Sequence, residues 1–140
     1  MTDDADDALV DGLVQTSFVV MGVLTRVAAD HDLSLTQLRM LGVLRDRRPR
    51  MAQLAALLGL DKSTVSGLIE RAERRGLVRR LPSPQDARAV EVEATPDGLA
   101  LARTGAAEVR DALQPLLDGV DARGRSTLLR ELDGLLAALR

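Results

Sequence analysis

Hydroxyl-bearing and cationic side chains gather between residues 62 and 88, with types and spacing that suit contact with nucleic acid. Residues 62–75 repeat apolar side chains at helical spacing, and the opposite face opens with small polar residues and ends with arginine. Such side chains let a helix N-terminus sit deep in a DNA major groove and approach the base edges. The residues expected to contact DNA from this helix are Lys62, Ser63, Thr64, Ser66, Gly67 and Arg71.

A basic hairpin follows this helix. Two short strands are predicted at 77–81 and 89–94, with a proline-rich turn between them. Arg88 lies near the predicted tip, where a guanidinium can enter a minor groove in which A·T-rich DNA concentrates negative potential. The expected DNA contacts of the hairpin are Arg79, Arg80 and Arg88.

Three acidic residues accompany these arginines. We expect Asp86 to hold Arg88 or a neighbouring arginine in place, with a plain turn-forming aspartate as the alternative. In the second strand, apolar residues alternate with Glu91 and Glu93, which predicts that these glutamates face solvent.

A second helix positions the first, as in a helix-turn-helix. A short helix is predicted at 51–58, ended by Gly59 in the left-handed conformation, and Asp61 is the expected N-cap of the next helix. Apolar side chains of the two helices should pack together. They are Leu54, Ala55, Leu57 and Leu58 from one helix, and Val65, Leu68, Ile69 and Ala72 from the other.

Longer helices are predicted before and after this segment. Residues 8–30 and 122–139 read as helices, the first with an apolar stripe too broad for a surface helix. Such stripes need cover from other helices or from a second subunit. Residues 1–7 are acidic and lack an apolar anchor, so we expect a disordered tail there.

Two further helix starts carry clear signals. Ser34 and Gln37 have the spacing of a capping box. Thr95-Pro96-Asp97 begins a helix expected to run toward Leu113, with Pro115 kinking or ending it.

Charge is distributed unevenly along the chain, although the net charge is only −2. Residues 39–88 hold 12 basic and 5 acidic residues, a balance of +7, and the remainder carries −9. A basic middle between acidic ends is typical of one module that faces phosphates and another that does not. Arg-rich solvated helix faces are the alternative.

Several classes of function are excluded by composition. The 140 residues contain no cysteine, and His31 is the only histidine, so we expect no metal site, no thiol chemistry and no cofactor. No nucleophile–base pair or phosphate-binding loop is visible, which argues against an enzyme and leaves no catalytic residue to name. The acidic N-terminus is no signal peptide, and the longest apolar run, 18–24, is too short to span a membrane, so we expect a cytoplasmic protein.

The chain resembles the MarR family of winged helix-turn-helix transcriptional regulators. The matching motifs are LSLTQLRML, LAALLGLDKSTVSGLIERAERRGLVRR and DARAVEVEATPDGLAL. The last is similar to the family's D-x-R…L-T-x-x-G pattern, with Asp86, Arg88, Thr95 and Gly98 in place and Ala94 where leucine is usual. Gly67 also departs from the family, many members of which have a basic residue there; it either permits closer approach to the groove or lacks a base contact.

The resemblance implies a mainly α fold with a small β-hairpin wing. It implies a DNA-binding lobe at 34–95 and a helical dimerisation lobe formed by 8–33 and 96–140. It further implies a homodimeric regulator, expected to be a repressor, on pseudo-palindromic double-stranded DNA, with the recognition helix in the major groove and the wing in the minor groove. The alternative is a winged-helix module that binds proteins and has lost specific DNA binding.

The resemblance also implies a place for a small-molecule effector. Family members that bind aromatic acids do so between the dimerisation helices and the DNA-binding lobe. For Arg26 and His31 the alternative is a solvated helix end. The residues that this chain offers in that region are Phe18, Met21, Arg26, His31 and Met40.

Overall fold

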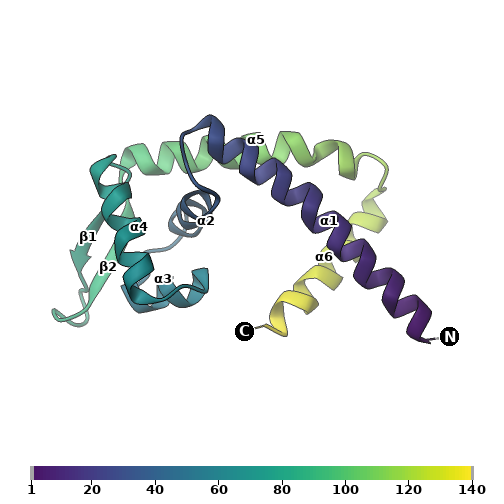
Figure 1. Ribbon diagram of the computed structural model, residues 1–140, viewed down its shortest axis with the longest axis horizontal. Helices are drawn as coiled ribbons and strands as arrows, with labels where there is room; N and C mark the ends of the chain where they lie inside the picture. Colours follow the sequence, from purple (N-terminus) through teal and green to yellow (C-terminus); the bar gives the residue numbers. More distant parts are fainter. Residues whose placement is uncertain (1, 140) are drawn as a thin grey trace. The chain divides into compact units, whose positions relative to one another are not determined.

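Six helices and one two-stranded sheet make up residues 2–139, the part of the chain that the computed structural model describes (Figure 1). The elements are α1 (Thr2–Asp30), α2 (Leu35–Leu44), α3 (Met51–Leu58), α4 (Lys62–Arg74), β1 (Val78–Pro82), β2 (Val90–Ala94), α5 (Pro96–Leu117) and α6 (Ala122–Ala137). They fall into two compact units, Met1–Val109 and Arg110–Arg140. The mainly α fold with a hairpin wing is confirmed, whereas the division into DNA-binding and dimerisation lobes stays a prediction.

Local capping signals place the helix ends where the sequence predicts them. The Ser34 hydroxyl accepts a hydrogen bond from the Gln37 N–H at 3.1 Å, and the Gln37 side chain accepts one from the Ser34 N–H at 2.9 Å. Gly59 ends α3 at φ 66° and Gly76 follows α4 at φ 71°, in the left-handed region that glycine adopts without steric cost. Ser34 therefore fixes the start of α2, Gly59 the turn between α3 and α4, and Gly76 the end of α4.

The N-terminal helix is longer than predicted. α1 begins at Thr2, so the expectation of disorder is wrong for residues 2–7, and Met1 lies outside the described residues. Asp3 and Asp4 occupy the first turn, where carboxylates interact favourably with the positive end of the helix dipole. Residues Asp3–Asp30 are also long and apolar enough to cross a membrane, contrary to the expectation from 18–24, because scattered charges interrupt the run without making the helix polar.

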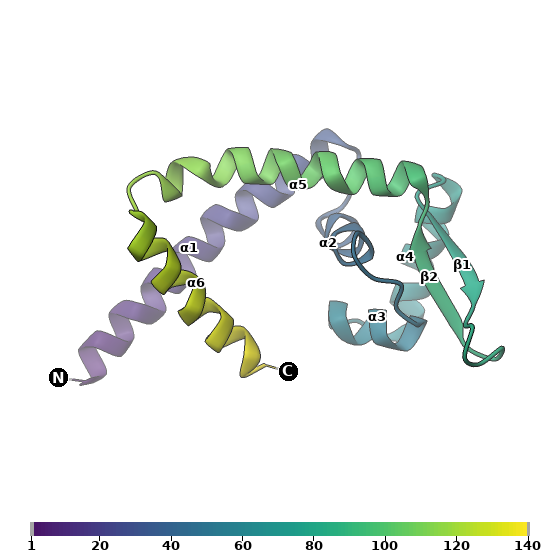
Figure 2. The ribbon, with the colours of Figure 1, turned by 180° about the vertical axis from the view of Figure 1, so that it is seen from behind.

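The core of the first unit lies between α2, α3, α4 and the hairpin. Figure 2 shows these elements from behind. Val65, Leu68, Ile69 and Ala72 of α4 are all buried, as predicted, together with Leu54, Ala55 and Leu58 of α3. The prediction that Leu57 packs against α4 is wrong, because 39% of this residue is exposed. Position 57 lies at the edge of the face that 54, 55 and 58 share, so its side chain turns away from α4.

The two strands pair in antiparallel register from Val78↔Ala94 to Pro82↔Val90. A third segment joins them, since the Val92 N–H donates to the Pro49 carbonyl at 2.9 Å and residue 50 bridges to residue 91. The prediction that Glu91 and Glu93 face solvent is wrong, because only 8% of each residue is exposed. The third segment, residues 48–50, lies against β2 and covers this edge, and Arg48 reaches the Glu93 carboxylate.

The start of α5 is fixed tightly to the end of α4. The Thr95 hydroxyl accepts a hydrogen bond from the Gly98 N–H at 3.1 Å and donates one to the Gly76 carbonyl at 2.5 Å. A Cβ at Gly98 would lie 1.9 Å from the Leu77 carbonyl oxygen, so only glycine fits there. Pro115 lies inside α5 and does not end it, because the helix continues to Leu117.

Large apolar faces stay uncovered in each unit. On α1, Phe18 is 71% exposed. Among the described residues of α6, none is buried, although the helix carries a stripe of leucines. The exposed side chains are Leu9, Val10, Leu13, Val14, Phe18, Val19 and Met21 on α1, and Leu128, Leu129, Leu132, Leu135 and Leu136 on α6.

Candidate nucleic-acid interface

The exposed face of α4 begins at a charged N-cap. The Asp61 carboxylate accepts hydrogen bonds from the Thr64 N–H and the Ser63 hydroxyl, each at 2.8 Å. The hydrogen bond from the Thr64 backbone, followed by that from the Ser63 hydroxyl, holds the pKa of Asp61 below its ordinary value. The Ser63 hydroxyl proton is therefore engaged with the cap, while its oxygen can still accept a hydrogen bond.

The predicted reading residues all lie on one side of α4. Lys62, Ser63, Thr64 and Arg71 are exposed, and Ser66 and Gly67 are half-buried. A Cβ at Gly67 would lie 3.5 Å from the Arg71 Nη1, an ordinary contact, so alanine would fit at this position in the free protein. The structure thus gives Gly67 no steric requirement of its own, and the Arg71 side chain lies over it.

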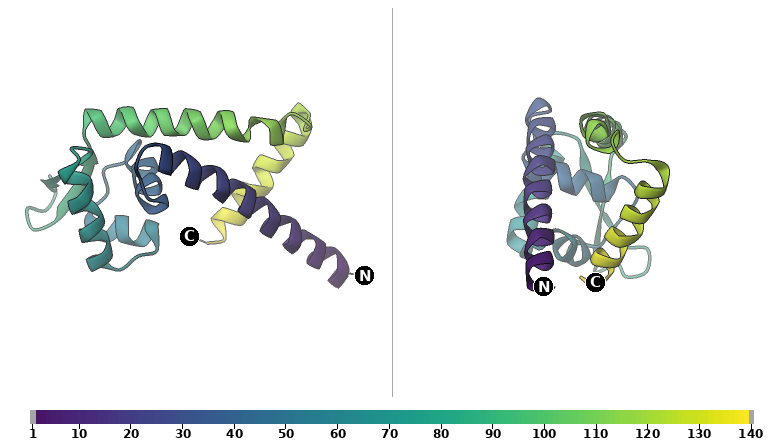
Figure 3. Two further views of the ribbon diagram at one scale, coloured as in Figure 1. Left: turned by 45° about the horizontal axis from the view of Figure 1, so that its top comes forward. Right: turned by 90° about the vertical axis from the view of Figure 1, so that its right-hand side faces the viewer.

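A groove of about 430 Å³ lies beside this face and is lined by residues of α3, α4 and the hairpin. Figure 3 shows the ribbons of these elements. The groove brings Lys62 and Ser66 next to Arg50, which precedes α3. Arg50 is a residue that the sequence reasoning missed. The signal for it was available, since Arg50 ends the run RDRRPR directly before α3. The groove is lined by Arg50, Met51, Ala52, Lys62, Val65, Ser66, Ala89 and Val90.

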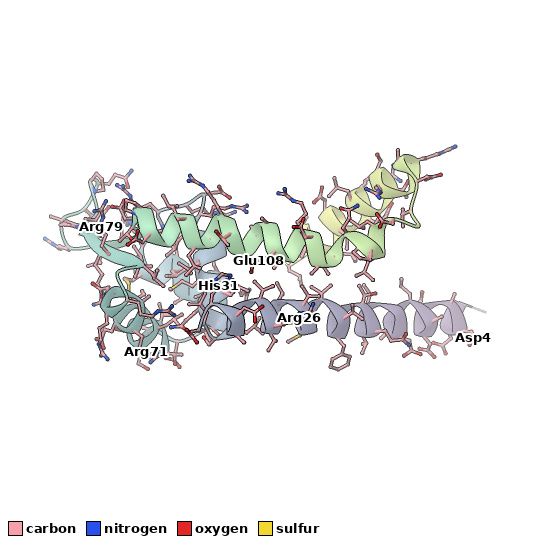
Figure 4. The ribbon with its side chains drawn as sticks, turned by 90° about the horizontal axis from the view of Figure 1, so that it is seen from above. Asp4, Arg26, His31, Arg71, Arg79 and Glu108 are labelled. Atoms are coloured by element: carbon pink, nitrogen blue, oxygen red, sulfur yellow. The ribbon has the colours of Figure 1, made fainter. Side chains whose placement is uncertain are left out.

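Arg79 is held by carboxylate contacts within the sheet. Glu93 pairs with both Arg79 and Arg48, and only 11% of its side chain is exposed. Burial raises the pKa of the Glu93 carboxyl, but the hydrogen bond from Arg79 and the charge of Arg48 outweigh burial, so the pKa lies below its ordinary value. Figure 4 shows Arg79 on the other side of this unit from Arg71.

Arg80 is similarly engaged, because it connects the wing to α4. Its Nε lies 3.0 Å from a Glu73 oxygen and its Nη2 lies 3.9 Å from a Glu70 oxygen. Arg79 and Arg80 therefore hold the hairpin in place in the free protein. Of the three predicted hairpin contacts, Arg88 is exposed and makes no ion pair with the described residues.

The tip of the wing is shaped by Asp86. Its carboxylate accepts a hydrogen bond from the Arg88 N–H at 3.0 Å, and its carbonyl accepts one from the Ala89 N–H at 3.0 Å. This is an Asx turn, so the turn-forming alternative describes Asp86 better than an ion pair with Arg88. Asp86 positions Arg88 through the backbone.

Of the five residues predicted to form an effector pocket, only Met21 lines the cavity between α1, α2 and α5. Met40 is fully buried, Phe18 and Arg26 are exposed, and His31 pairs with Glu108, with 2.8 Å between Nε2 and Oε2. The cavity, of about 780 Å³, lies between α1, α2 and the first half of α5. Its other lining residues are Leu24, Leu35, Leu38, Arg39, Gly42, Val43, Arg45, Asp46, Arg47, Ala102, Gly105, Ala106 and Val109.

Within residues 2–139, no three His, Cys, Asp or Glu side chains are grouped so that they could hold a metal ion. The candidate site consists of the exposed face of α4, the groove beside it and the wing tip.

The MarR family model matches residues 31–89, from the end of α1 to the wing. The HTH-type transcriptional repressor NicR of Pseudomonas putida is 38% identical over 80 residues, which cover 56% of this chain and 51% of NicR, about half its length. The HTH-type transcriptional regulator PecS of Dickeya dadantii is 29% identical over 136 residues, covering 91% of this chain and 82% of PecS.

A solved structure extends the similarity to the fold. The crystal structure of NadR in complex with 4-hydroxyphenylacetate matches with a TM-score of 0.78 and 24% identity, over 92% of each chain. The named relatives are transcriptional regulators and not enzymes. The chain is therefore similar to the MarR family over the helix-turn-helix and wing, to the transcriptional regulator PecS along most of both chains, and to NadR in fold.

Proposed function

We propose that this chain is a MarR-family transcriptional regulator, and that it is a repressor that binds a pseudo-palindromic operator sequence-specifically as a homodimer. The observation that carries the proposal is the polar face of α4, where Lys62 and Ser66 adjoin Arg50 in one groove. Small polar side chains at a helix N-terminus suit base readout, and the flanking cations suit phosphate contact. In this proposal α4 enters the major groove and Arg88 reaches the adjacent minor groove from the wing.

Dimerisation is part of the proposal because apolar faces remain exposed. The exposed leucines, valines and Phe18 of α1 form a patch that a soluble monomer would rarely leave uncovered. A second copy of the chain would cover such a patch and would place two recognition helices at successive major grooves, roughly 10 base pairs apart.

A small-molecule effector is the third part of the proposal. We place its binding site in the cavity between α1, α2 and α5. The cavity has a mainly apolar lining with three arginines and one carboxylate, Asp46, which pairs with Arg45 at 3.0 Å. The charges of Arg39 and Arg47 favour a ligand with an acidic group and an apolar body. The bound molecule in the NadR structure, 4-hydroxyphenylacetate, is of this chemical class. A panel of aromatic carboxylates should contain a member that raises the Tm and releases DNA, whereas a panel without effect on either would contradict this part.

The proposed action on chromosomal DNA places the protein in the cytoplasm. The helix α1 is long and apolar enough to cross a membrane, as core helices of soluble proteins also are. In the proposed homodimer, a second copy of the chain would cover its apolar face. The competing function is a winged-helix module that binds another protein. The exposed Arg88 and the polar face of α4 favour DNA, because an interface core between proteins is usually depleted of charge.

A DNA-binding experiment separates these two functions. An electrophoretic shift with the DNA upstream of the chain's own gene, repeated at several salt concentrations, should give specific binding whose affinity falls steeply as salt rises. The control is bulk DNA of the same length. Equal affinity for both DNAs at moderate salt would contradict the repressor and favour the protein-binding module.

A further inference from the structure

The C-terminal end of the recognition helix is attached to the turn between α1 and α2. Arg75, the C-cap residue of α4, donates a hydrogen bond from Nη1 to the Asp32 carbonyl at 2.7 Å. It donates another from Nη2 to the His31 carbonyl at 3.0 Å. One guanidinium therefore holds two successive carbonyl groups from a segment 43 residues away in the sequence.

The turn is built so that these two carbonyls are available. The Leu33 N–H donates to the Ala28 carbonyl at 2.8 Å, and the Asp32 N–H donates to the Ala29 carbonyl at 3.1 Å. This is the Schellman arrangement, with Asp32 in the left-handed conformation at φ 55°. It satisfies the carbonyls of Ala28 and Ala29, and the carbonyls of His31 and Asp32 accept the two hydrogen bonds from Arg75.

The same turn also contacts α5. The His31 imidazole pairs with Glu108 at 2.8 Å, and 21% of the His31 side chain is exposed (Figure 4). The turn is thus held by α4 through its carbonyl groups and by α5 through its side chain. Arg75, the turn and Glu108 connect the recognition helix to α1 and α5, which both contribute residues to the lining of the cavity.

We propose that Arg75 is a positioning residue for DNA binding, which fixes the angle of the recognition helix by holding its C-terminal end on the α1–α2 turn. The inference rests on the proposed DNA-binding function. About ten residues separate Arg75 from the reading residues near Ser66, a distance of roughly 15 Å along a helix. A tilt of about 10° at Arg75 would therefore move the reading residues by roughly 3 Å, enough to break base contacts.

The two hydrogen bonds from the planar Arg75 guanidinium predict which substitutions weaken operator binding. Lysine retains the charge but cannot bind two carbonyls in one plane, so R75K should fail to replace arginine. Arg74 provides a matched control, since it is the neighbouring residue, carries the same charge and makes only a 4.0 Å contact with Glu70. R74Q and R75Q each remove one positive charge at nearly the same place. Only R75Q also removes the two hydrogen bonds to the His31 and Asp32 carbonyls.

The test measures operator and bulk DNA affinities of wild type, R75Q, R75K and R74Q. Operator affinity should fall about tenfold in R75Q and R75K, the scale of one charge-assisted hydrogen bond, and about threefold or less in R74Q. R75K should keep wild-type affinity for bulk DNA and the wild-type salt dependence, because its charge is unchanged. A variant that is partly unfolded would bind both operator and bulk DNA more weakly, because less of the protein is active. The active fraction of each variant is therefore titrated at a temperature well below its Tm.

Two results overturn the positioning role. One is operator binding by R75K that equals wild type, and the other is a loss in R75Q no larger than in R74Q. Absence of any operator preference in the wild type is a separate result. It would overturn the proposed DNA-binding function, and the positioning role with it.

Discussion

The carboxylate of Glu93 on β2 accepts a hydrogen bond from the Nε of Arg79, the residue opposite it on β1. Arg48 binds the other oxygen of the same carboxylate, from the segment before α3. One buried anion therefore ties three stretches of chain together at the base of the wing. Two of the cations that make residues 39–88 basic thus serve the fold of the wing.

This carboxylate should make stability depend on pH in the acid range. The folded-state pKa of Glu93 lies below the ordinary 4.5, so its ionised form stabilises the fold fully at neutral pH. That contribution should be lost as the pH falls below 4.5, where the unfolded chain takes up the proton first. Urea unfolding of wild type and E93Q from pH 7 to pH 3 should show a steeper acid loss in the wild type. E131Q removes a carboxylate that is 67% exposed and should keep the wild-type profile; a parallel pair of curves for wild type and E93Q would contradict the role of Glu93.

Gly98 should be the least replaceable glycine of the first unit. G98A would place a Cβ 1.9 Å from the Leu77 carbonyl oxygen, forcing α5 away from the end of α4, at a cost of about 3 kcal/mol. G42A is the control, because nothing lies within 4 Å of its new Cβ and alanine favours the interior of α2 by about 1 kcal/mol. The free energy of unfolding should therefore change in opposite directions, and equal effects would refute the tight contact.

Arg88 should be the principal contact of the wing. R88A should weaken operator binding by about 1–3 kcal/mol and leave the oligomeric state intact, because the side chain is exposed. D86N keeps an oxygen that can accept the Arg88 N–H and should bind DNA at least as tightly as wild type, whereas D86A should bind less well. If R88A binds the operator like wild type, the wing tip is not a contact. If D86A also binds like wild type, the Asx turn is dispensable.

Helix ends and turns were predictable because their causes are local. Ser34, Gly59 and Asp61 act on backbone groups within a few residues, and each lies where the sequence predicts it. The pairing of Glu93 was not predictable in the same way. The alternation of apolar and acidic residues at 90–94 is typical of a half-exposed strand. The cation that pairs with Glu93, Arg48, lies 45 residues earlier in the chain. Long-range ion pairs leave no periodic signal.

The candidate site, too, was predictable only where its causes are local in the sequence. The reading face of α4 follows from a single helical repeat, and Val65, Leu68, Ile69 and Ala72 are buried as that repeat requires. Arg79 and Arg80 were selected by charge alone, and charge does not reveal that glutamates of β2 and α4 already bind them. The effector residues were selected by region, and a cavity depends on how three separate helices pack.

Leu132 offers a test of the proposed dimer. L132D introduces a charge on the exposed leucine stripe of α6, and burial of that charge in an interface should weaken association on the order of 100-fold or more. S126D adds the same charge at an exposed polar position of the same helix and should leave the dimer unchanged. Sedimentation velocity measures both. An unperturbed L132D dimer would place the last helix outside the interface.

The lack of any buried residue within α6 has a genetic consequence. An isolated helix of 16 residues is marginal in water, so residues 122–137 need a surface from outside their own sequence to stay ordered. In the proposed homodimer, the other subunit supplies that surface. A copy with a damaged last helix would then disorder the matching helix of a sound copy, and co-expression of such a variant would be dominant over the wild-type allele.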